Sequence, residues 1–243
     1  EAAGQLVSDQ GYKKVALIAP NYPAGRDHLN GFKRFYKGDI VMEEYTQLKQ
    51  LDYGAELSKL RASGADAVYI FLPGGLGVNF IKQFAGAGLS DDMKLFAPGF
   101  SADEDVIAAV GEPMVGIQNT SQWAHDMDSE INKRFVADFQ EEYGRLPTMY
   151  ASQGYDAALL MDGAVRKVGG DLSDKDAMRA ALESAPFEAL QGNFKFDVNH
   201  YPIQDFYVRE VIKDDQGRVT NRLVGKVFEN HRDAYVDQCK MPS

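Results

Sequence analysis

The chain contains the stretch "ALIAPNYPAGRDHLNGF" at residues 16–32, where an apolar run stops at a break and a helical pattern follows. The break is made of Pro20, Asn21, Pro23 and Gly25, residues that favour turns over the interior of a strand or helix. A buried strand that leads through a short turn into a helix is the first half of a β-α-β unit. The stretch therefore predicts the start of a parallel sheet, with a turn that could hold a phosphate, a catalytic residue or another ligand group.

Five apolar runs, the first of them inside this stretch, have the length and composition of strands that are buried on both faces. They are "KVALIA" from Lys14, "IVMEEY" from Ile40, "AVYIFL" from Ala67, "KLFAPGF" from Lys94 and "MVGIQN" from Met114. The second run alternates apolar and charged residues, which places it nearer an edge. Helical stripes with i, i+3, i+4 spacing lie between the runs. Because this order requires right-handed crossovers, it predicts an α/β fold with a mostly parallel, doubly wound sheet.

The pattern changes after Trp123, where three helical patterns follow one another. They lie at residues 131–139, at residues 155–165 and in "LSDKDAMRAALESA". We expect Ser173 to cap the third helix and Asp176 to complete its capping box. Three strand-like runs come last, "GNFKFDVN", "DFYVREVIK" and "RLVGKVFEN", and "DDQGRVTN" predicts a hairpin turn between the last two. These helices and antiparallel strands are expected to form a different layer or lobe.

The composition is that of a soluble globular protein that can bury a core, with 243 residues of which 44% are hydrophobic. The formal net charge of −10 disfavours a nucleic-acid partner, which requires a basic patch. No apolar run is long enough to span a membrane, and the chain does not open with a signal-peptide pattern. The opening "EAAGQLVSDQGY" lacks Met and has helical spacing, so we expect a mature fragment of a longer protein. Cys239 is the only cysteine, which leaves a free thiol or a bond to a cysteine in an absent segment.

In a doubly wound sheet, ligands bind at the carboxyl ends of the strands. The segments at those ends are residues 21–26, 73–77, 98–101 and 119–123. The "PGGLG" of residues 73–77 resembles a phosphate cradle, but a dinucleotide fingerprint would need a third glycine where Phe80 stands. We therefore interpret it as a turn whose glycines let a small ligand approach.

Signals of catalysis and of metal binding are weak. The four histidines are isolated in sequence and are expected to be surface or capping residues; they are His28, His125, His200 and His231. Ser101 stands in "GFSAD", which lacks the second glycine of a nucleophile elbow. The acids of "DEDVI" at residues 103–107 are expected at a helix start from the macrodipole alone. No cofactor or metal is indicated, and we expect a binding protein rather than an enzyme.

The side chains that remain after the predicted strand ends are mainly aromatic and amide groups. They are Tyr22, Phe100, Gln122 and Trp123, with Tyr150 near the start of a helix. Flat rings with a few polar groups suit a pocket that closes over an apolar body. Arg26 is either a solvated surface residue or the partner of a ligand carboxylate. These residues favour reversible binding of a small molecule.

The succession of "GYKKVALIAPNYPAGRDHLNGFK", "LRASGADAVYIFLPGG", "FIKQFAGAGL" and "YASQGYDAALLMDGAV" resembles the branched-chain amino acid type of periplasmic solute-binding protein, the receptor component of ABC importers. The resemblance covers nearly the whole chain. It implies two doubly wound lobes that close over a ligand at a hinge. It also implies that residues 1–121 form the second lobe and residues 122–205 the returning part of the first. Residues 206–243 would cross the hinge again, and the opening part of the first lobe would be missing.

Residue by residue, the resemblance carries the family's aromatic ligand wall onto Tyr22, a loop contact onto Pro73 and Gly74, and a hinge-side aromatic onto Tyr150. Amino acid binders place a Glu after the proline of the fourth strand, where this chain has Gly99. Without that carboxylate, the ammonium group of an amino acid would be buried unpaired, at a cost of several kcal/mol. An amino acid is thus a poor match for the ligand.

We therefore expect an aromatic or apolar carboxylate as ligand, favoured by the rings of Tyr22, Phe100 and Tyr150 and by the space freed at Gly99. The resemblance implies a periplasmic or lipoprotein-anchored location and an ABC permease as partner. The other expected partner is the missing first-lobe segment, for which Cys239 is the candidate point of attachment. The alternatives are binding of a branched-chain amino acid or amide, a ligand-sensing domain of a regulator, and a hydrolase on the same fold.

Overall fold

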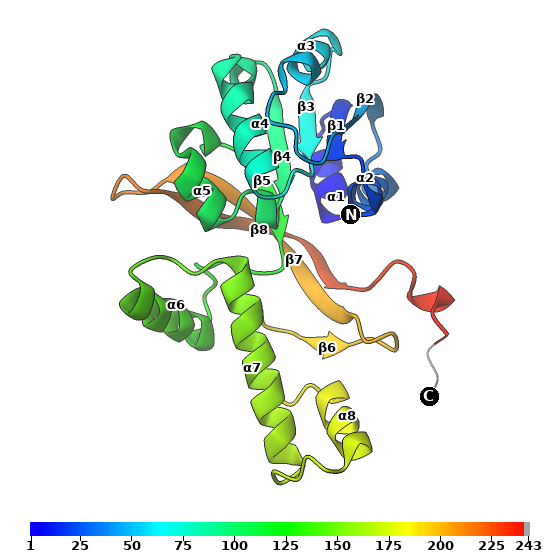
Figure 1. Cartoon of the computed structure of the whole chain (residues 1–243), viewed down its shortest axis with the longest axis vertical. Helices are drawn as coiled ribbons and strands as arrows, with labels where there is room; N and C mark the ends of the chain where they lie inside the picture. The colour runs from blue at the N-terminus through cyan, green and yellow to red at the C-terminus, as the bar shows by residue number, and fades with distance from the viewer. Residues whose placement is uncertain (241–243) are drawn as a thin grey trace. The chain divides into compact units, whose positions relative to one another are not determined.

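The structure is a computed structural model, and it describes residues 1–240 (Figure 1). The chain divides into two compact units. Unit 1 comprises Glu1–Ser121 and Val208–Val227, and unit 2 comprises Gln122–Tyr207 and the segment from Phe228 onward. No helix within the described residues has both the length and the apolar character that a bilayer crossing requires.

Unit 1 alternates helices and strands from its first residue. Its elements are α1 (Ala2–Asp9), β1 (Lys14–Pro20), α2 (Pro23–Phe35), β2 (Asp39–Thr46), α3 (Gly54–Ala62), β3 (Ala67–Ile70), α4 (Gly75–Gly86), β4 (Lys94–Pro98), α5 (Glu104–Val110) and β5 (Gln118–Ser121). The strands pair in parallel in the order β2-β1-β3-β4-β5. This is the mostly parallel, doubly wound sheet that the sequence predicts, with the charged strand β2 at its edge.

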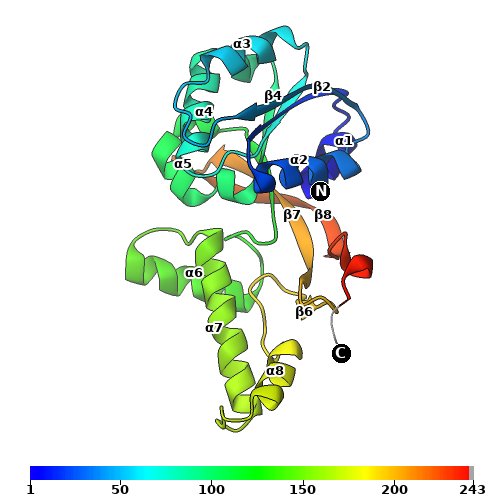
Figure 2. The same cartoon turned by 45° about the vertical axis from the view of Figure 1, so that its right-hand side comes forward.

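The two faces of this sheet carry separate apolar cores, because successive residues of a strand point to opposite sides. On β1, Val15 and Leu17 pack with α1 and α2, whereas Ala16 and Ile18 pack with α3, α4 and α5. Figures 1 and 2 show these two sets of helices on opposite faces. The helix that follows β1 and the helix that precedes β3 therefore cover different faces. The order of the strands reverses between β1 and β3, which is the position where doubly wound sheets bind ligands.

Strand β5 begins later than the sequence pattern predicts. The apolar run that begins at Met114 is expected to be extended, but Glu112–Met114 form a short 3-10 helix and the strand starts only at Gln118. Gly116 has φ +89°, a left-handed conformation that interrupts extended backbone. Only the final residues of that run belong to the sheet.

Unit 2 includes the α-helices α6 (Glu130–Tyr143), α7 (Met149–Lys167) and α8 (Lys175–Glu183) and the short strand β6 (Lys195–Phe196). The long strands β7 (Pro202–Lys213) and β8 (Val219–His231) pair with each other and contribute residues to both units. In unit 1, β7 lies next to β5, so the hairpin belongs in part to the parallel sheet rather than wholly to a separate layer. In unit 2, β7 pairs with β6 in antiparallel register.

The cap of α8 differs from the predicted one. The carboxylate of Asp174 accepts the backbone N–H groups of Asp176 at 3.1 Å and of Ala177 at 2.9 Å. The hydroxyl of Ser173 donates instead to the carboxylate of Asp171 at 2.6 Å. A carboxylate at the N-cap satisfies two helical N–H groups and opposes the positive end of the helix dipole, which explains why Asp174 displaces Ser173 from this role.

Candidate functional site

Four aromatic rings gather where the carboxyl ends of β1, β3 and β4 meet, and we call them the aromatic cluster: Tyr22, His28, Phe71 and Phe100. The imidazole of His28 stacks on Phe71 with ring centroids 4.0 Å apart and meets the edge of Phe100 at 5.7 Å. Phe71 also stacks with Tyr22 at 6.2 Å and contacts Phe100 edge-on at 5.4 Å. Phe71 is 5% exposed, and the other three rings are half-buried. The cluster therefore presents aromatic surface at the point where the strand order reverses.

The turn between β1 and α2 brings Tyr22 and His28 to this position. Tyr22 is the N-cap of α2, in extended conformation, and Pro23 starts the helix with its fixed φ. A Cβ at Gly25 would overlap the carbonyl oxygen of Pro20, so only glycine lets the helix approach the strand end so closely. His28 follows about one turn into α2 and reaches back over the sheet.

His28 does not behave as the surface or capping residue that the sequence suggests. Burial lowers the pKa of its imidazole to about 3, so the ring is neutral at physiological pH. Its spacing from Phe32 and Phe35, at i+4 and i+7, is the signal that could have identified it as part of the inward face of α2. Phe71 was missed because it follows β3 directly and its sequence context is that of any buried strand residue.

Arg26 is exposed and already has two partners in unit 1. It donates to the side-chain oxygen of Asn21 at 2.7 Å, and its guanidinium lies 4.6 Å from the ring centroid of Tyr45. The first contact lies within the turn between β1 and α2, and the second is with β2. Arg26 is thus close to the aromatic cluster in sequence, but in the structure its side chain contacts Asn21 and Tyr45.

Pro73 and Gly74 form the turn between β3 and α4. Gly74 is the N-cap of α4, with φ +58° and ψ −131°, a backbone conformation that a residue with a Cβ adopts only under strain. A Cβ at Gly77 would overlap the carbonyl oxygen of Leu72. The glycines of "PGGLG" therefore allow a tight strand-to-helix turn. Gly74 is exposed and Pro73 is half-buried, so both are accessible at the carboxyl edge.

The absent side chain at Gly99 does not leave open space, which corrects the expectation of a freed volume there. A Cβ at this position would lie 3.0 Å from the Cβ of Ser121 and 3.2 Å from an Nη of Arg209. Arg209 comes from β7, is 1% exposed and donates to the carbonyl oxygen of Gly99 at 3.0 Å. The room at Gly99 is used by a buried guanidinium of the same unit.

Arg209 is the centre of a buried polar network that the sequence analysis missed. It donates from Nε to the side-chain oxygen of Asn119 at 2.8 Å and lies 3.5 Å from the carboxylate of Asp103. The amide of Asn119 donates to Asn221 of β8 at 2.8 Å. Asn221 in turn donates to the carbonyl oxygen of Ala102 at 2.8 Å. The strand pattern "FYVREVIK" gives no sign of which charged residue points inward, so only the fold reveals this arginine.

The two predicted site residues of unit 2 have different environments. Trp123 is 1% exposed, and its indole N–H donates to the side-chain oxygen of Asn132 at 2.7 Å. Its ring meets Phe135 edge-on, so the structure places it in the packed interior of unit 2. Tyr150, in the first turn of α7, is 59% exposed. Cys239 is also exposed.

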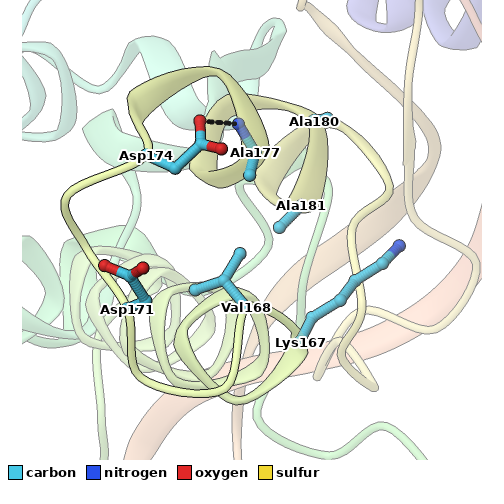
Figure 3. A pocket seen from close by; sticks show the side chains of 7 residues that line it. All are labelled: Lys167, Val168, Asp171, Asp174, Ala177, Ala180 and Ala181. Carbon is cyan, nitrogen blue, oxygen red and sulfur yellow. Dashed lines mark hydrogen bonds between the residues drawn. The ribbon is translucent and has the colours of Figure 1, made fainter.

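Unit 2 has a pocket of about 380 Å³ between the end of α7 and α8, which Figure 3 shows from close by. Its lining side chains are Lys167, Val168, Asp171, Asp174, Ala177, Ala180 and Ala181. The two carboxylates already serve local structure, since Asp174 caps α8 and Asp171 accepts from Ser173. No aromatic ring lines it, and it offers little that would orient a ligand.

A second pocket of unit 2, of about 310 Å³, is lined by amide and aromatic side chains together with Asp156. Burial raises the pKa of the Asp156 carboxyl to about 6, although it accepts the backbone N–H of Leu190 at 2.9 Å. Among residues 1–240, no three His, Cys, Asp or Glu side chains come together in a way that could hold a metal ion.

Comparison with known proteins assigns the fold to a family. The family model "Periplasmic binding protein" matches residues 1–217. The Leu/Ile/Val-binding protein homolog 6 of Brucella melitensis is 31% identical over 239 residues, which cover 94% of this chain and 60% of that protein. The chain therefore spans about three fifths of the length of the curated relatives it matches.

Among solved structures, a solute-binding protein of an ABC transporter from R. palustris in complex with benzoate has a TM-score of 0.89 and 32% identity, and the match covers 99% of this chain and 65% of that one. A solute-binding protein from Rhodopseudomonas palustris BisB5 in complex with 3,4-dihydroxybenzoic acid has a TM-score of 0.86 and 32% identity, with 96% and 64% covered. Since the family model spans most of the chain and the relatives share its fold throughout, this chain belongs to the periplasmic binding protein family.

Proposed function

We propose that this chain is part of the solute-binding receptor of an ABC importer and that it binds a small aromatic carboxylate reversibly. The observation that carries the proposal is the aromatic cluster at the carboxyl ends of β1 and β3. Aromatic faces and edges attract a flat ring by stacking and by burial of apolar area. The relatives with bound benzoate and 3,4-dihydroxybenzoic acid support this ligand class.

The environment of Gly99 argues against an amino acid as ligand. Position 99 has no side chain to pair with an ammonium group, and Asp103 is 2% exposed and paired with Arg209. A buried ammonium without a carboxylate partner would be strongly disfavoured. A branched-chain amino acid remains the second candidate because the curated relatives are named Leu/Ile/Val-binding homologues.

The residues that we propose for ligand contact are Tyr22, Phe100, Pro73, Gly74 and Tyr150. We further propose that unit 1 is the second lobe of the receptor and that unit 2 is part of the first. The length that the relatives have beyond this chain would supply the rest of that lobe. Exposed apolar side chains on α7, Tyr150 and Met161 among them, support a further covering segment.

The proposed location is the periplasm, or an anchored position outside the cytoplasmic membrane, and the proposed partner is an ABC permease. The proposed activity is binding without turnover. The neutral, ring-packed state of His28 and the capping role of Asp174 support this, because neither group is then poised as a general base.

The test is ligand binding to the full-length protein, measured by thermal shift and by calorimetry with benzoate, 4-hydroxybenzoate and leucine. A ligand that binds only the native state stabilises it by about 2.7 kcal/mol at a hundredfold excess over Kd. We expect the aromatic acids to raise the melting temperature. Tyr22→Ala and Phe100→Ala should each weaken the binding of these acids. Tyr143→Ala, at an exposed position of α6, is the control. Stabilisation by leucine and not by the acids would contradict the proposal.

A further inference from the structure

We propose that His28 is a ligand-binding residue whose imidazole forms a hydrogen bond with an uncharged hydroxyl group on the ring of the aromatic acid. The inference rests on the proposed function and narrows its ligand class to hydroxylated aromatic carboxylates. It starts from the position of His28 in the aromatic cluster, stacked on Phe71 at 4.0 Å and against the edge of Phe100 at 5.7 Å.

The ring nitrogens of His28 have no hydrogen-bond partner within residues 1–240, although the ring is half-buried among apolar rings. Among the described residues, the buried side-chain atoms without a hydrogen-bond partner are the hydroxyl groups of Thr46 and Tyr53, so the nitrogens of His28 keep access to solvent. A ligand that stacks on this cluster would displace that water, and the imidazole then keeps its hydrogen bonds only if the ligand supplies a polar group. A phenyl ring at this position would make the same stacking contacts but could not form such a bond.

The protonation state of the imidazole decides which end of the ligand it can meet. Burial holds the ring neutral, so it has one N–H donor and one nitrogen acceptor. A hydroxyl group also donates and accepts, and it matches either tautomer. A carboxylate against Phe71 and Phe100 would lose its water beside apolar rings, and the guanidinium of the neighbouring Arg26 contacts Asn21 and Tyr45 rather than these rings. The hydroxyl end of the ligand fits this position, and the carboxylate does not.

The test compares affinities of the full-length protein for 4-hydroxybenzoate and benzoate, measured by calorimetry before and after His28→Phe. Phenylalanine keeps the stacking and removes both nitrogens. We expect the affinity for 4-hydroxybenzoate to fall about tenfold, as for a lost neutral hydrogen bond, while the affinity for benzoate stays within about twofold. His231→Phe is the matched control, since His231 also stacks on a phenylalanine, Phe228, at 4.2 Å, but in unit 2.

The outcomes separate this inference from the proposed function. If neither acid binds the unchanged protein, the proposed function fails. If both acids bind and His28→Phe weakens them equally, or weakens benzoate more, the hydroxyl contact of His28 is refuted while the function stands. Where the variant does not fold, nitrogen-15 NMR of histidine in the unchanged protein gives the answer. The nitrogen-15 chemical shifts of the His28 ring should change when 4-hydroxybenzoate is added and change much less with benzoate. Equal changes with both acids would overturn the inference.

Discussion

Replacing Arg209 with methionine should destabilise unit 1 severely. The guanidinium is 1% exposed and makes charge-assisted hydrogen bonds to the oxygens of Asn119 and Gly99 at 2.8 and 3.0 Å. The variant would leave the carboxylate of Asp103, itself 2% exposed, buried without its cation. Removal of one partner of a buried ion pair costs about 3–5 kcal/mol. Against a total stability of about 5–15 kcal/mol for a typical domain, this is a large fraction.

The assay is urea unfolding at pH 7 followed by far-UV circular dichroism, since the only tryptophan, Trp123, lies in unit 2 and would report on that unit. The double variant Arg209→Met with Asp103→Asn removes the stranded charge and should recover a substantial part of the loss. Arg222→Met, at an exposed position of β8, is the control and should change stability by less than about 0.5 kcal/mol. A loss below about 1 kcal/mol for Arg209→Met, or no recovery in the double variant, would refute the reasoning.

Three further changes test other parts of the structure. Gly99→Ala should cost about 1–3 kcal/mol by the same urea assay, because the added methyl group lies 3.2 Å from an Nη of Arg209; an unchanged midpoint would contradict this packing. Since the raised pKa of Asp156 makes the native state bind more protons than the unfolded chain between about pH 4 and pH 6, stability falls as pH rises through this window. Asp156→Asn should therefore raise the melting temperature at pH 7 and leave it almost unchanged at pH 4, and a gain of equal size at both pH values would disprove this origin. Trp123→Phe removes the donor to the buried side chain of Asn132 and should cost about 1–3 kcal/mol in thermal unfolding, whereas a neutral result would show that the hydrogen bond is dispensable.

The architecture of unit 1 could be predicted because buried parallel strands and amphipathic helices leave a periodic record in the sequence. The charged alternation of β2 identified the edge strand, and the break after β1 identified the turn that leads to Tyr22. The start of β4 at Lys94 agrees with the prediction, but the strand ends at Pro98 because Gly99–Ser101 form a short 3-10 helix. The start of β5 was also misplaced, since the left-handed turn at Gly116 interrupts an otherwise apolar run.

The site could be predicted only in part, because the roles of its residues depend on neighbours distant in sequence. Tyr22 and Phe100 directly follow strands, and they were predicted because ligands bind at the carboxyl ends of the strands in such a sheet. The rings of His28 and Phe71 come into contact only when α2 packs on β3. Arg209 becomes buried only when β7 joins the sheet beside β5. The space at Gly99 was misjudged for the same reason, since an arginine 110 residues further along the chain fills it.

The amide and guanidinium chain that links Asn119, Arg209 and Asn221 also determines how the terminal hairpin can align with the sheet. Strand β8 carries several exposed polar residues, so its apolar pattern alone specifies its alignment weakly. A slip of β7 by one residue would turn Arg209 to the opposite face and bring Val208 or Glu210 against Asp103. In such a misaligned hairpin, the buried carboxylate of Asp103 would lose its ion pair with Arg209. The network therefore favours one alignment of this hairpin over the alignments shifted by one residue.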